Sequence, residues 1–284
     1  MTNLDKVLYP KAGFTKGEVI DYYARVADTM VPHLRGRPTT LKRYPDGVEG
    51  FNFFEKRSPK HRPDWVKTAT VLADRAGEID FTLVDNKPTL VWLAQLASLE
   101  LHPSLAKASK IEVPSFLAFD LDPGPPAGLA ECCEVAGLLN DALSALGLES
   151  FAKTSGSKGI QVYVPLNVEG VNYRQGTKRL SQALARHLES AHPELIVSQQ
   201  KKELRKGKVL IDWSQNDEHK TTVGVYSLRA RERPTVSTPL ARSELEDGDS
   251  AELVFEADAV LERLEEHGDL FAPVVEQVQR LPEL

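Results

Sequence analysis

A chain of 284 residues, 41% hydrophobic and 27% charged, is long enough to bury a sizeable core and has an ordinary globular composition. No apolar run approaches the roughly 20 residues that a membrane-spanning helix needs, and the first residues lack the layout of a signal peptide. Cys132 and Cys133 are adjacent and have no distant partner, which excludes a disulfide framework and favours core packing for both. These features predict a cytoplasmic protein with no membrane partner.

Charge is distributed unevenly along the chain. The net charge is −6, but residues 240–284 hold 13 acidic and 3 basic residues, which leaves 32 basic and 28 acidic residues elsewhere. A nucleic-acid backbone responds to local basic patches rather than to the total charge. Ordinary solvated charge is the alternative explanation for any single patch. Four basic clusters occur: Lys42 with Arg43; Lys56, Arg57, Lys60 and Arg62; Lys201, Lys202, Arg205, Lys206 and Lys208; and Arg229, Arg231 and Arg233.

The N-terminal third predicts one long helix followed by shorter elements. Thr15 and Glu18 have the spacing of a capping box, and apolar residues follow them at helical intervals. Pro32 should end this helix near Val31. The next segments are predicted as short strands within residues 39–54 and 68–84, and as a helix over residues 88–101 that Pro88 opens.

From residue 115 on, the pattern of strands and helices is clearer. Residues 115–122 have the pattern of a strand, and residues 127–146 that of a helix that Gly147 ends. The alternation is too irregular for a parallel nucleotide-binding sheet. We therefore expect an α/β (α+β) fold with a mixed or antiparallel sheet flanked by helices. The remaining predictions are strands over residues 150–155, 160–166, 209–214 and 222–228, and helices over residues 178–191 and 251–266.

Two aspartates stand two residues apart near the end of the first of these strands. Asp120 and Asp122 therefore share one face, and Pro123 and Gly124 end the strand at an open edge. Two like charges this close repel each other unless a cation lies between them. Asp212 closes another aliphatic strand, and three converging carboxylates would suit Mg²⁺ or Mn²⁺ and in-line phosphoryl transfer. An ordinary acidic pair in a turn is the alternative.

A glycine-rich turn lies between two of the predicted strands. Its glycines allow close backbone approach, its amides and hydroxyls can donate to oxyanions, and its lysine supplies charge. It does not match the Gly-x-x-x-x-Gly-Lys loop, so a standard ATPase is not implied, and an ordinary hairpin turn is the alternative. The sequence of this segment is Lys153-Thr154-Ser155-Gly156-Ser157-Lys158-Gly159.

Together these motifs resemble the polymerase domain of ligase D, which belongs to the archaeo-eukaryotic primase superfamily. The resemblance extends over nearly the whole chain. It is carried by Phe119-Asp120-Leu121-Asp122-Pro123, by Thr154-Ser155-Gly156-Ser157-Lys158-Gly159, by Val209-Leu210-Ile211-Asp212-Trp213-Ser214-Gln215-Asn216, and by residues 5–10, 53–56, 63–66, 220–222 and 226–229.

The resemblance implies a primase-type catalytic core with an RRM-like sheet, and roles for named residues. Asp120, Asp122 and Asp212 would be catalytic and would bind two metal ions, Mg²⁺ or Mn²⁺. The nucleotide-binding residues would be Lys42, His102, Ser155, Ser157, Lys158, Gly159, Gln161 and Arg229. The DNA-binding residues would be Asn3, Lys6, Lys16, Phe53, Phe54, Lys56, Arg205 and Lys220; the first three match a 5′-phosphate pocket, and the phenylalanines match aromatic residues at the template.

The implied activity is template-dependent addition of nucleotides, with a preference for ribonucleotides, at DNA gaps and broken ends in non-homologous end joining or gap repair. The substrates would be nucleoside triphosphates and DNA with a 5′-phosphorylated gap or end, in a nucleoid-associated setting. Ku and an ATP-dependent DNA ligase are the expected partners. We expect one primase-polymerase domain over residues 1–284, with an N-terminal α/β portion (1–114), an RRM-like catalytic portion (115–235) and an acidic helical portion (236–284).

One position departs from the family pattern, because Gln161 stands where a histidine is usual. Glutamine can hydrogen-bond a phosphate oxygen but cannot carry charge, so histidine here is predicted to strengthen nucleotide binding, increasingly at low pH. Two other functions stay open at this point. One is a non-catalytic module of the same fold that binds DNA ends, and the other is a metal-dependent phosphoesterase that uses the same carboxylates.

Overall fold

The computed structural model describes residues 1–72, 77–246 and 252–282. Within these residues, no helix is long and apolar enough to cross a membrane. The division of a single domain into three consecutive portions stays a prediction. By its internal contacts the chain forms two compact units: unit 1 consists of Met1–Ile111, Thr221–Ser237 and Phe255–Asp269, and unit 2 of Glu112–Lys220, Thr238–Val254 and Leu270–Leu284.

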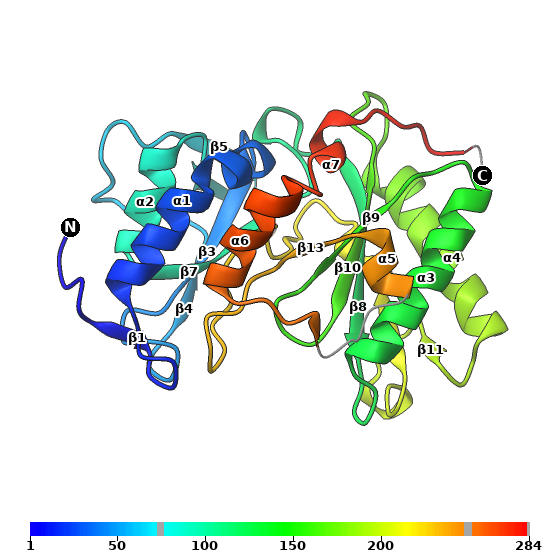
Figure 1. The fold of residues 1–284 in the computed structure, drawn as a ribbon. Coiled ribbons are helices and arrows are strands. Elements are labelled where there is room, and N and C mark those ends of the chain that lie inside the picture. Colours follow the sequence, from blue (N-terminus) through cyan, green and yellow to red (C-terminus); the bar gives the residue numbers. More distant parts are fainter. Residues whose placement is uncertain (73–76, 247–251, 283–284) are drawn as a thin grey trace. The chain divides into compact units, whose positions relative to one another are not determined.

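Unit 1 is built on an antiparallel sheet (Figure 1). Its elements are β1 Val7–Tyr9, β2 Phe14–Thr15, α1 Lys16–Leu34, β3 Pro38–Arg43, β4 Phe53–Glu55, β5 Thr68–Leu72, β6 Glu78–Leu83, α2 Lys87–Gln95, β7 Ser98–Pro103, a 3₁₀ turn at Ala108–Lys110, and α6 Ala257–His267. The strands run in the order β4-β3-β6-β5, and β7 also pairs with β3. Helices α1 and α2 pack against each other beside this sheet.

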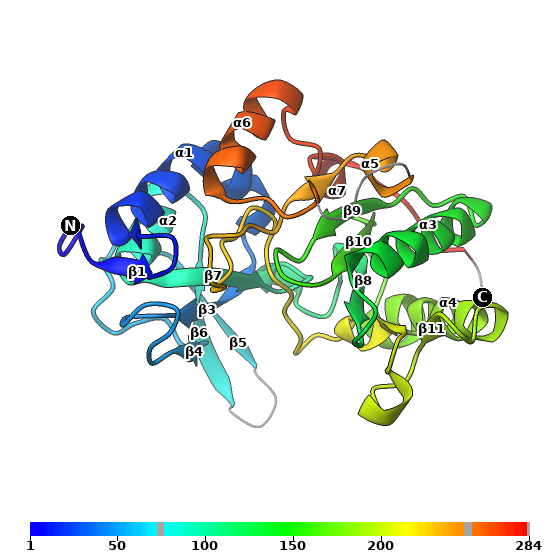
Figure 2. The same cartoon turned by 60° about the horizontal axis from the view of Figure 1, so that its bottom comes forward.

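Unit 2 contains a six-stranded sheet with two long helices against it (Figure 2). Its elements are β8 Phe116–Pro123, α3 Leu129–Ala145, β9 Phe151–Thr154, β10 Ile160–Pro165, a π-helical turn at Tyr173–Thr177, α4 Lys178–Ala191, β11 Ile196–Val197, β12 Val209–Asp212, 3₁₀ turns at Lys202–Leu204 and Trp213–Gln215, β13 Pro239–Leu240, α5 Arg242–Glu246 and α7 Pro273–Glu276. The strand order is β11-β12-β8-β10-β9-β13. Only β11 and β12 run parallel among these pairs within the described residues, so the mixed sheet predicted from the sequence is confirmed.

The start of α1 is as predicted, but its end is not. The Glu18 amide donates to the Thr15 hydroxyl at 3.3 Å and the Thr15 amide donates to the Glu18 carboxylate at 2.7 Å, which completes the capping box. The helix runs past Pro32 to Leu34, so the predicted end near Val31 is wrong. A proline weakens the turn that precedes it, but here the last turn still closes, because the Arg35 amide bonds the Val31 carbonyl at 2.9 Å.

Two further segments differ from the prediction. The helix expected over residues 88–101 is present only as α2, because Ala97 adopts a left-handed φ of 55° and the chain then enters strand β7. The strand expected over residues 222–228 is wrong, since this segment is irregular and only Leu228 makes an isolated bridge, to Val236. Tyr226 has a φ of 63°, which a continuous strand does not allow.

The C-terminal acidic helix is shorter than the predicted 251–266. It begins at Ala257 as α6, and residue 251 lies outside the described residues. The strand predicted over 209–214 ends at Asp212, where a 3₁₀ turn begins. The helix over 178–191 is present with those bounds, and both cysteines are buried and free of disulfides.

Candidate active site

Three aspartates lie on adjacent antiparallel strands of unit 2. Strands β8 and β12 pair so that Asp212 lies opposite Asp120 and Leu210 lies opposite Asp122. Residues directly opposite each other on such strands have Cβ atoms about 5 Å apart on one face, and Asp122 lies two residues along β8 on that same face. The other face of β8 belongs to the core, where Leu117, Phe119 and Leu121 are fully buried.

The electrostatics of Asp120 fit a cation site. Burial raises the pKa of Asp120, the charges of Asp212 and Asp122 raise it further, and the hydrogen bond from Gln161 and the charge of Lys153 lower it, with a result of about 6. A divalent cation between these carboxylates would remove the repulsion and favour their ionised forms. Carboxylate oxygens are also the ligands that Mg²⁺ and Mn²⁺ prefer.

All three carboxylates have side-chain partners in this structure, and that of Asp120 is Gln161. Asp122 forms an ion pair with Arg205. Asp212 accepts hydrogen bonds from the Ser214 backbone amide at 2.9 Å, from the Ser214 hydroxyl at 2.6 Å and from the Gln215 side-chain Nε2 at 2.8 Å. In the part of the chain that the structure describes, no group of three or more His, Cys, Asp or Glu side chains is arranged as a metal site.

A row of buried and half-buried polar residues crosses four strands and includes Asp120. Lys153 on β9 lies opposite Gln161 on β10, Gln161 lies opposite Asp120 on β8, and Asp120 lies opposite Asp212 on β12. The Lys153 ammonium donates to Gln161 Oε1 at 2.5 Å, and Gln161 Nε2 donates to Asp120 Oδ1 at 3.2 Å. Gln161 is only 4% exposed and Lys153 only 1%. The predicted contact of Gln161 with a nucleotide phosphate stays a prediction.

Lys153 is a candidate site residue that the sequence reasoning missed. It belongs to the quoted turn segment, but its place inside a strand gives no sign that its ammonium is buried beside Gln161. Lys153 could have been found as a lysine within a short apolar strand. A lysine buried there needs a polar or charged partner, which indicates a site.

The glycine-rich turn is held against the carboxylate strand. The Ser155 amide bonds the Gly159 carbonyl at 2.8 Å, and the Gly159 amide donates to the Ser155 hydroxyl at 3.2 Å. A Cβ atom at Gly159 would lie 2.0 Å from the Leu121 carbonyl oxygen, so only glycine allows this approach. Lys158 is exposed and Ser157 is half-buried, where both can be reached by an anion.

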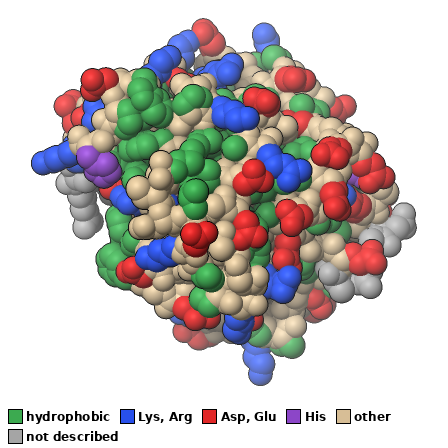
Figure 3. Space-filling view, turned by 60° about the vertical axis from the view of Figure 1, so that its left-hand side comes forward, with side chains coloured by type: hydrophobic (Ala, Val, Ile, Leu, Met, Phe, Trp, Pro, Cys, Tyr) green, Lys and Arg blue, Asp and Glu red, His purple; other side chains and the backbone are tan. Residues whose placement is uncertain are grey.

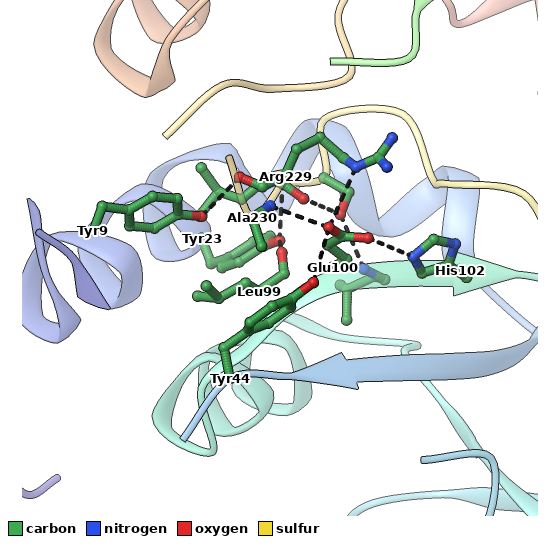
Figure 4. A network of polar contacts seen from close by, with 11 residues as sticks. Tyr9, Tyr23, Tyr44, Leu99, Glu100, His102, Arg229 and Ala230 are labelled. Atoms are coloured by element: carbon green, nitrogen blue, oxygen red, sulfur yellow. Dashed lines mark hydrogen bonds and ion pairs between the residues drawn. The ribbon is translucent and has the colours of Figure 1, made fainter. Parts of the chain in front are cut away.

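Three of the predicted nucleotide-binding residues lie together in unit 1, around a buried glutamate that the sequence reasoning missed. His102 and Arg229 both contact the Glu100 carboxylate (Figure 4), at 3.0 Å from Nε2 and 3.5 Å from Nε. Lys42 lies opposite Glu100 in the pairing of β3 with β7. The other predicted nucleotide-binding residues, Ser155, Ser157, Lys158, Gly159 and Gln161, belong to unit 2.

The two predicted template aromatics do not share a face, because neighbouring residues of a strand point in opposite directions. Phe54 is 60% exposed and lies against the Lys42 ammonium and the His102 ring, with centroid distances of 5.1 and 5.8 Å. Phe53 stacks on Phe51 with ring centroids 5.6 Å apart. Figure 3 shows one face of the molecule where hydrophobic side chains gather beside lysine and arginine side chains.

The residues predicted to bind a 5′-phosphate lie together at the start of α1. Lys16 is only 8% exposed and donates to the Thr2 carbonyl at 3.0 Å. Burial lowers the pKa of Lys16, and so does the charge of Lys6, so the two ammonium groups are close enough to repel each other. Lys6 donates to the Pro45 carbonyl at 2.6 Å, and the Asn3 carbonyl accepts from the Lys6 amide at 3.2 Å.

The remaining predicted DNA-binding residues are spread over both units. Lys56 in unit 1 and Lys220 in unit 2 are exposed. Arg205 in unit 2 contacts Asp122, a partner that the sequence did not indicate. These placements leave their contacts with DNA as predictions.

Comparison with known proteins identifies the family. Residues 15–271 match the primase-polymerase domain of LigD. The chain is 43% identical over 276 residues to the multifunctional non-homologous end joining protein LigD of Mycolicibacterium smegmatis, covering 96% of this chain and 36% of that protein. It is 32% identical over 267 residues to the bifunctional LigD of Bacillus subtilis, covering 94% of this chain and 42% of that protein.

A solved structure agrees with this similarity over the full length. The polymerase domain from Mycobacterium tuberculosis ligase D in complex with DNA superposes with a TM-score of 0.91 at 41% identity, and the match covers 98% of each chain. The chain thus spans about two fifths or less of the curated relatives named above. It belongs to the LigD primase-polymerase domain family, whose members are metal-dependent, DNA-directed nucleotidyltransferases.

Proposed function

We propose that this chain adds nucleotides, with a preference for ribonucleotides, to primer ends at gaps and breaks in DNA, under the direction of a template strand. The observation that carries this proposal is the register that sets Asp212 opposite Asp120, with Asp122 on the same face and the Ser155–Gly159 turn against the same strand. Carboxylates that repel each other at a strand end, beside donors for an anion, suit the transfer of a phosphoryl group.

We propose Asp120, Asp122 and Asp212 as ligands of two ions, Mg²⁺ or Mn²⁺. Such ions, when bound, neutralise the triphosphate and activate the attacking hydroxyl. The protein's own contribution is orientation: Lys153 holds Gln161, and Gln161 holds one oxygen of Asp120. Arg205 contacts Asp122 through Oδ2, so Oδ1 is the oxygen that we propose for an ion, and the guanidinium lies where it can also meet a phosphate group.

The residues proposed to recognise the nucleotide and the DNA are donors that bind phosphate groups. Proposed nucleotide contacts are made by Lys158 and the serines of the turn, and by Lys42, His102 and Arg229. We propose that Lys6, Lys16 and Asn3 bind the 5′-phosphate of a gap, because two neighbouring lysines gain most from an anion between them. The relatives are named end-joining proteins, which supports Ku and a DNA ligase as partners and a nucleoid-associated location.

Primer extension on a gapped duplex tests this function. The duplex carries a 5′-phosphate across the gap, all four template bases are used in turn, and ribonucleotides are compared with deoxyribonucleotides in Mg²⁺, Mn²⁺ or EDTA. We expect addition that follows the template base, requires an ion and is faster with ribonucleotides. Addition that ignores the template base would contradict template direction, and DNA binding without any addition would support a non-catalytic end-binding module.

A further inference from the structure

The buried carboxylate of Glu100 in unit 1 has no role in the proposed reaction so far. Glu100 lies in β7 and is 3% exposed. An ionised carboxylate is costly to bury unless several donors and cations surround it. Its surroundings therefore indicate what this charge does.

Donors surround both oxygens of Glu100 (Figure 4). Oε1 accepts from the Ala230 amide at 3.1 Å and from the Tyr44 hydroxyl at 3.4 Å, and it lies 3.5 Å from Arg229 Nε. Oε2 lies 3.0 Å from His102 Nε2. Burial would raise the pKa of Glu100, but the hydrogen bond from His102 and the charge of Arg229 lower it to about 2, so the group is ionised at neutral pH.

An ionised partner fixes the tautomer of His102. A carboxylate is only an acceptor, so His102 Nε2 must carry the proton and donate it to Glu100. Burial lowers the pKa of His102, and the charges of Arg229 and Lys42 lower it further, while Glu100 opposes this change. The neutral ring then has its acceptor at Nδ1, the nitrogen that does not contact Glu100.

Glu100 also helps to fix the position of the segment that carries Arg229. Residues 226–230 form no regular strand. Backbone bonds from the Tyr226 amide to Ser237 and from the Arg229 amide to Thr235 hold them, and side chains add further bonds. The Tyr9 hydroxyl bonds the Arg229 carbonyl at 3.1 Å, the Leu228 amide bonds the Tyr23 hydroxyl at 3.1 Å, and Glu100 bonds the Ala230 amide. Glu100 also contacts the Arg229 and His102 side chains.

We propose that Glu100 is a positioning residue for nucleotide binding, which fixes the tautomer and orientation of His102 and the place of Arg229. This inference rests on the proposed function of His102 and Arg229. A positioning role and electrostatics alone predict opposite changes in triphosphate affinity when the charge of Glu100 is removed. Removing a negative charge next to Lys42 and Arg229 should tighten the binding of a triphosphate by electrostatics alone, whereas lost positioning should weaken it.

Glu100→Gln separates these two effects. The glutamine oxygen can still accept from the Ala230 amide, but its amide group donates towards His102 and forces the ring to accept at Nε2, which moves the proton to Nδ1. We expect the dissociation constant for ATP, measured with Mg²⁺ by calorimetry, to rise about tenfold. Glu100→Asp keeps the charge and should lose less than Glu100→Gln. Glu55→Gln, which removes the partner of Arg43 in the same sheet, is the matched control and should bind normally.

A second readout needs no nucleotide. Nitrogen-15 chemical shifts of His102 should show the proton on Nε2 in the wild type and on Nδ1 in Glu100→Gln, together with a lower His102 pKa in the variant. Tighter ATP binding by Glu100→Gln, or an unchanged His102 tautomer, would overturn the proposal. If the wild type shows the expected tautomer but binds no ATP, the proposed function fails while Glu100 still fixes the ring.

Discussion

Two carboxylates of this protein have pKa values shifted in opposite directions, although burial raises both. Asp120 in unit 2 has two other aspartates as neighbours, and its pKa is raised to about 6. Glu100 in unit 1 has a histidine, an arginine and a backbone amide as neighbours, and its pKa is lowered to about 2. The difference shows that neighbours rather than burial decide the charge of a buried acid. The charge of Arg229 and the hydrogen bond from His102 outweigh the burial of Glu100. The charge of Lys153 and the hydrogen bond from Gln161 do not outweigh the burial of Asp120 and its two aspartate neighbours, as expected of a group that binds an external cation.

The strongest test of this contrast is removal of a carboxylate at Asp120. Asp120→Ala should reduce nucleotide addition by about 10³-fold or more, because the carboxylate pair would no longer hold both ions. Stability without metal should hold or rise slightly, since repulsion among the aspartates is relieved. Primer extension in Mn²⁺ and thermal unfolding with EDTA measure the two effects.

A control on the same unit makes that test specific. Asp217→Ala removes another part-buried acid, which pairs with Lys178 at 2.8 Å, and should keep its extension activity. Mn²⁺ should raise the unfolding temperature of the wild type and of this control more than that of Asp120→Ala. Substantial extension by Asp120→Ala would contradict the proposed two-ion site.

For Glu100, the contrast is tested by the pH dependence of the free energy of unfolding. Because its folded pKa of about 2 lies below the reference value of 4.5, its ionisation stabilises the fold above pH 4.5, and this contribution is lost as pH falls towards 2. The full shift corresponds to about 3 kcal/mol. The loss of unfolding free energy in Glu100→Gln should therefore be about 2 kcal/mol larger at pH 7 than at pH 3. Denaturant unfolding at both pH values measures it, and equal losses would show that burial leaves Glu100 no more acidic than in the unfolded chain.

The lysine pair at the start of α1 predicts a smaller, ligand-specific effect. Lys16→Ala should weaken binding to a gap with a 5′-phosphate about tenfold, because a charge-assisted bond to phosphate is lost. Binding to the same gap without the phosphate should change little. Lys11→Ala, which removes an exposed lysine paired with Glu232, is the control. Equal losses by Lys16→Ala on both duplexes, measured by fluorescence anisotropy, would mean that the lysine acts as general backbone charge.

The sequence predicted those parts of the site that local patterns determine. Strand periodicity places Asp120 and Asp122 on one face, and the aliphatic strand that Asp212 closes indicates the third carboxylate. It could not predict Glu100, because a glutamate inside the predicted helix 88–101 gave no sign of a strand or of buried partners. Nor could it predict Arg205 beside Asp122, since Arg205 follows a short 3₁₀ turn and lies 83 residues from Asp122 in the chain. It did not predict Lys153 beside Gln161 either, because that contact depends on the register of the pairing between β9 and β10.

Irregular segments are also hard to predict from local sequence patterns, because distant contacts determine their conformation. Residues 222–228 have the composition of a strand, yet Tyr226 at a φ of 63° ends that pattern. Its conformation is stabilised by distant partners: the Tyr226 hydroxyl bonds Asp269 at 2.7 Å, and its carbonyl accepts from the Tyr22 hydroxyl at 2.8 Å. Local propensity is overridden by such contacts.

The smallest expected effect concerns Gln161, where a histidine is usual in the family. If the side chain contacted the triphosphate, Gln161→His would tighten nucleotide binding by about fivefold, since a charge-assisted bond is worth roughly 1 kcal/mol more than a neutral one. The bonds to Lys153 and Asp120 lead us to expect a smaller change. A neutral imidazole can accept from Lys153 through one nitrogen and donate to Asp120 through the other.

We therefore expect the apparent KM of Gln161→His to lie within about twofold of the wild type at pH 6 and pH 8. A protonated imidazole would have no acceptor for the Lys153 ammonium, and the two positive charges would repel each other, although Asp120 attracts both. In a Lys153→Met background this repulsion is absent, so the histidine should gain a pH dependence that the single variant lacks. A fivefold gain at pH 6 in the single variant would show instead that this side chain leaves Lys153 and contacts the nucleotide.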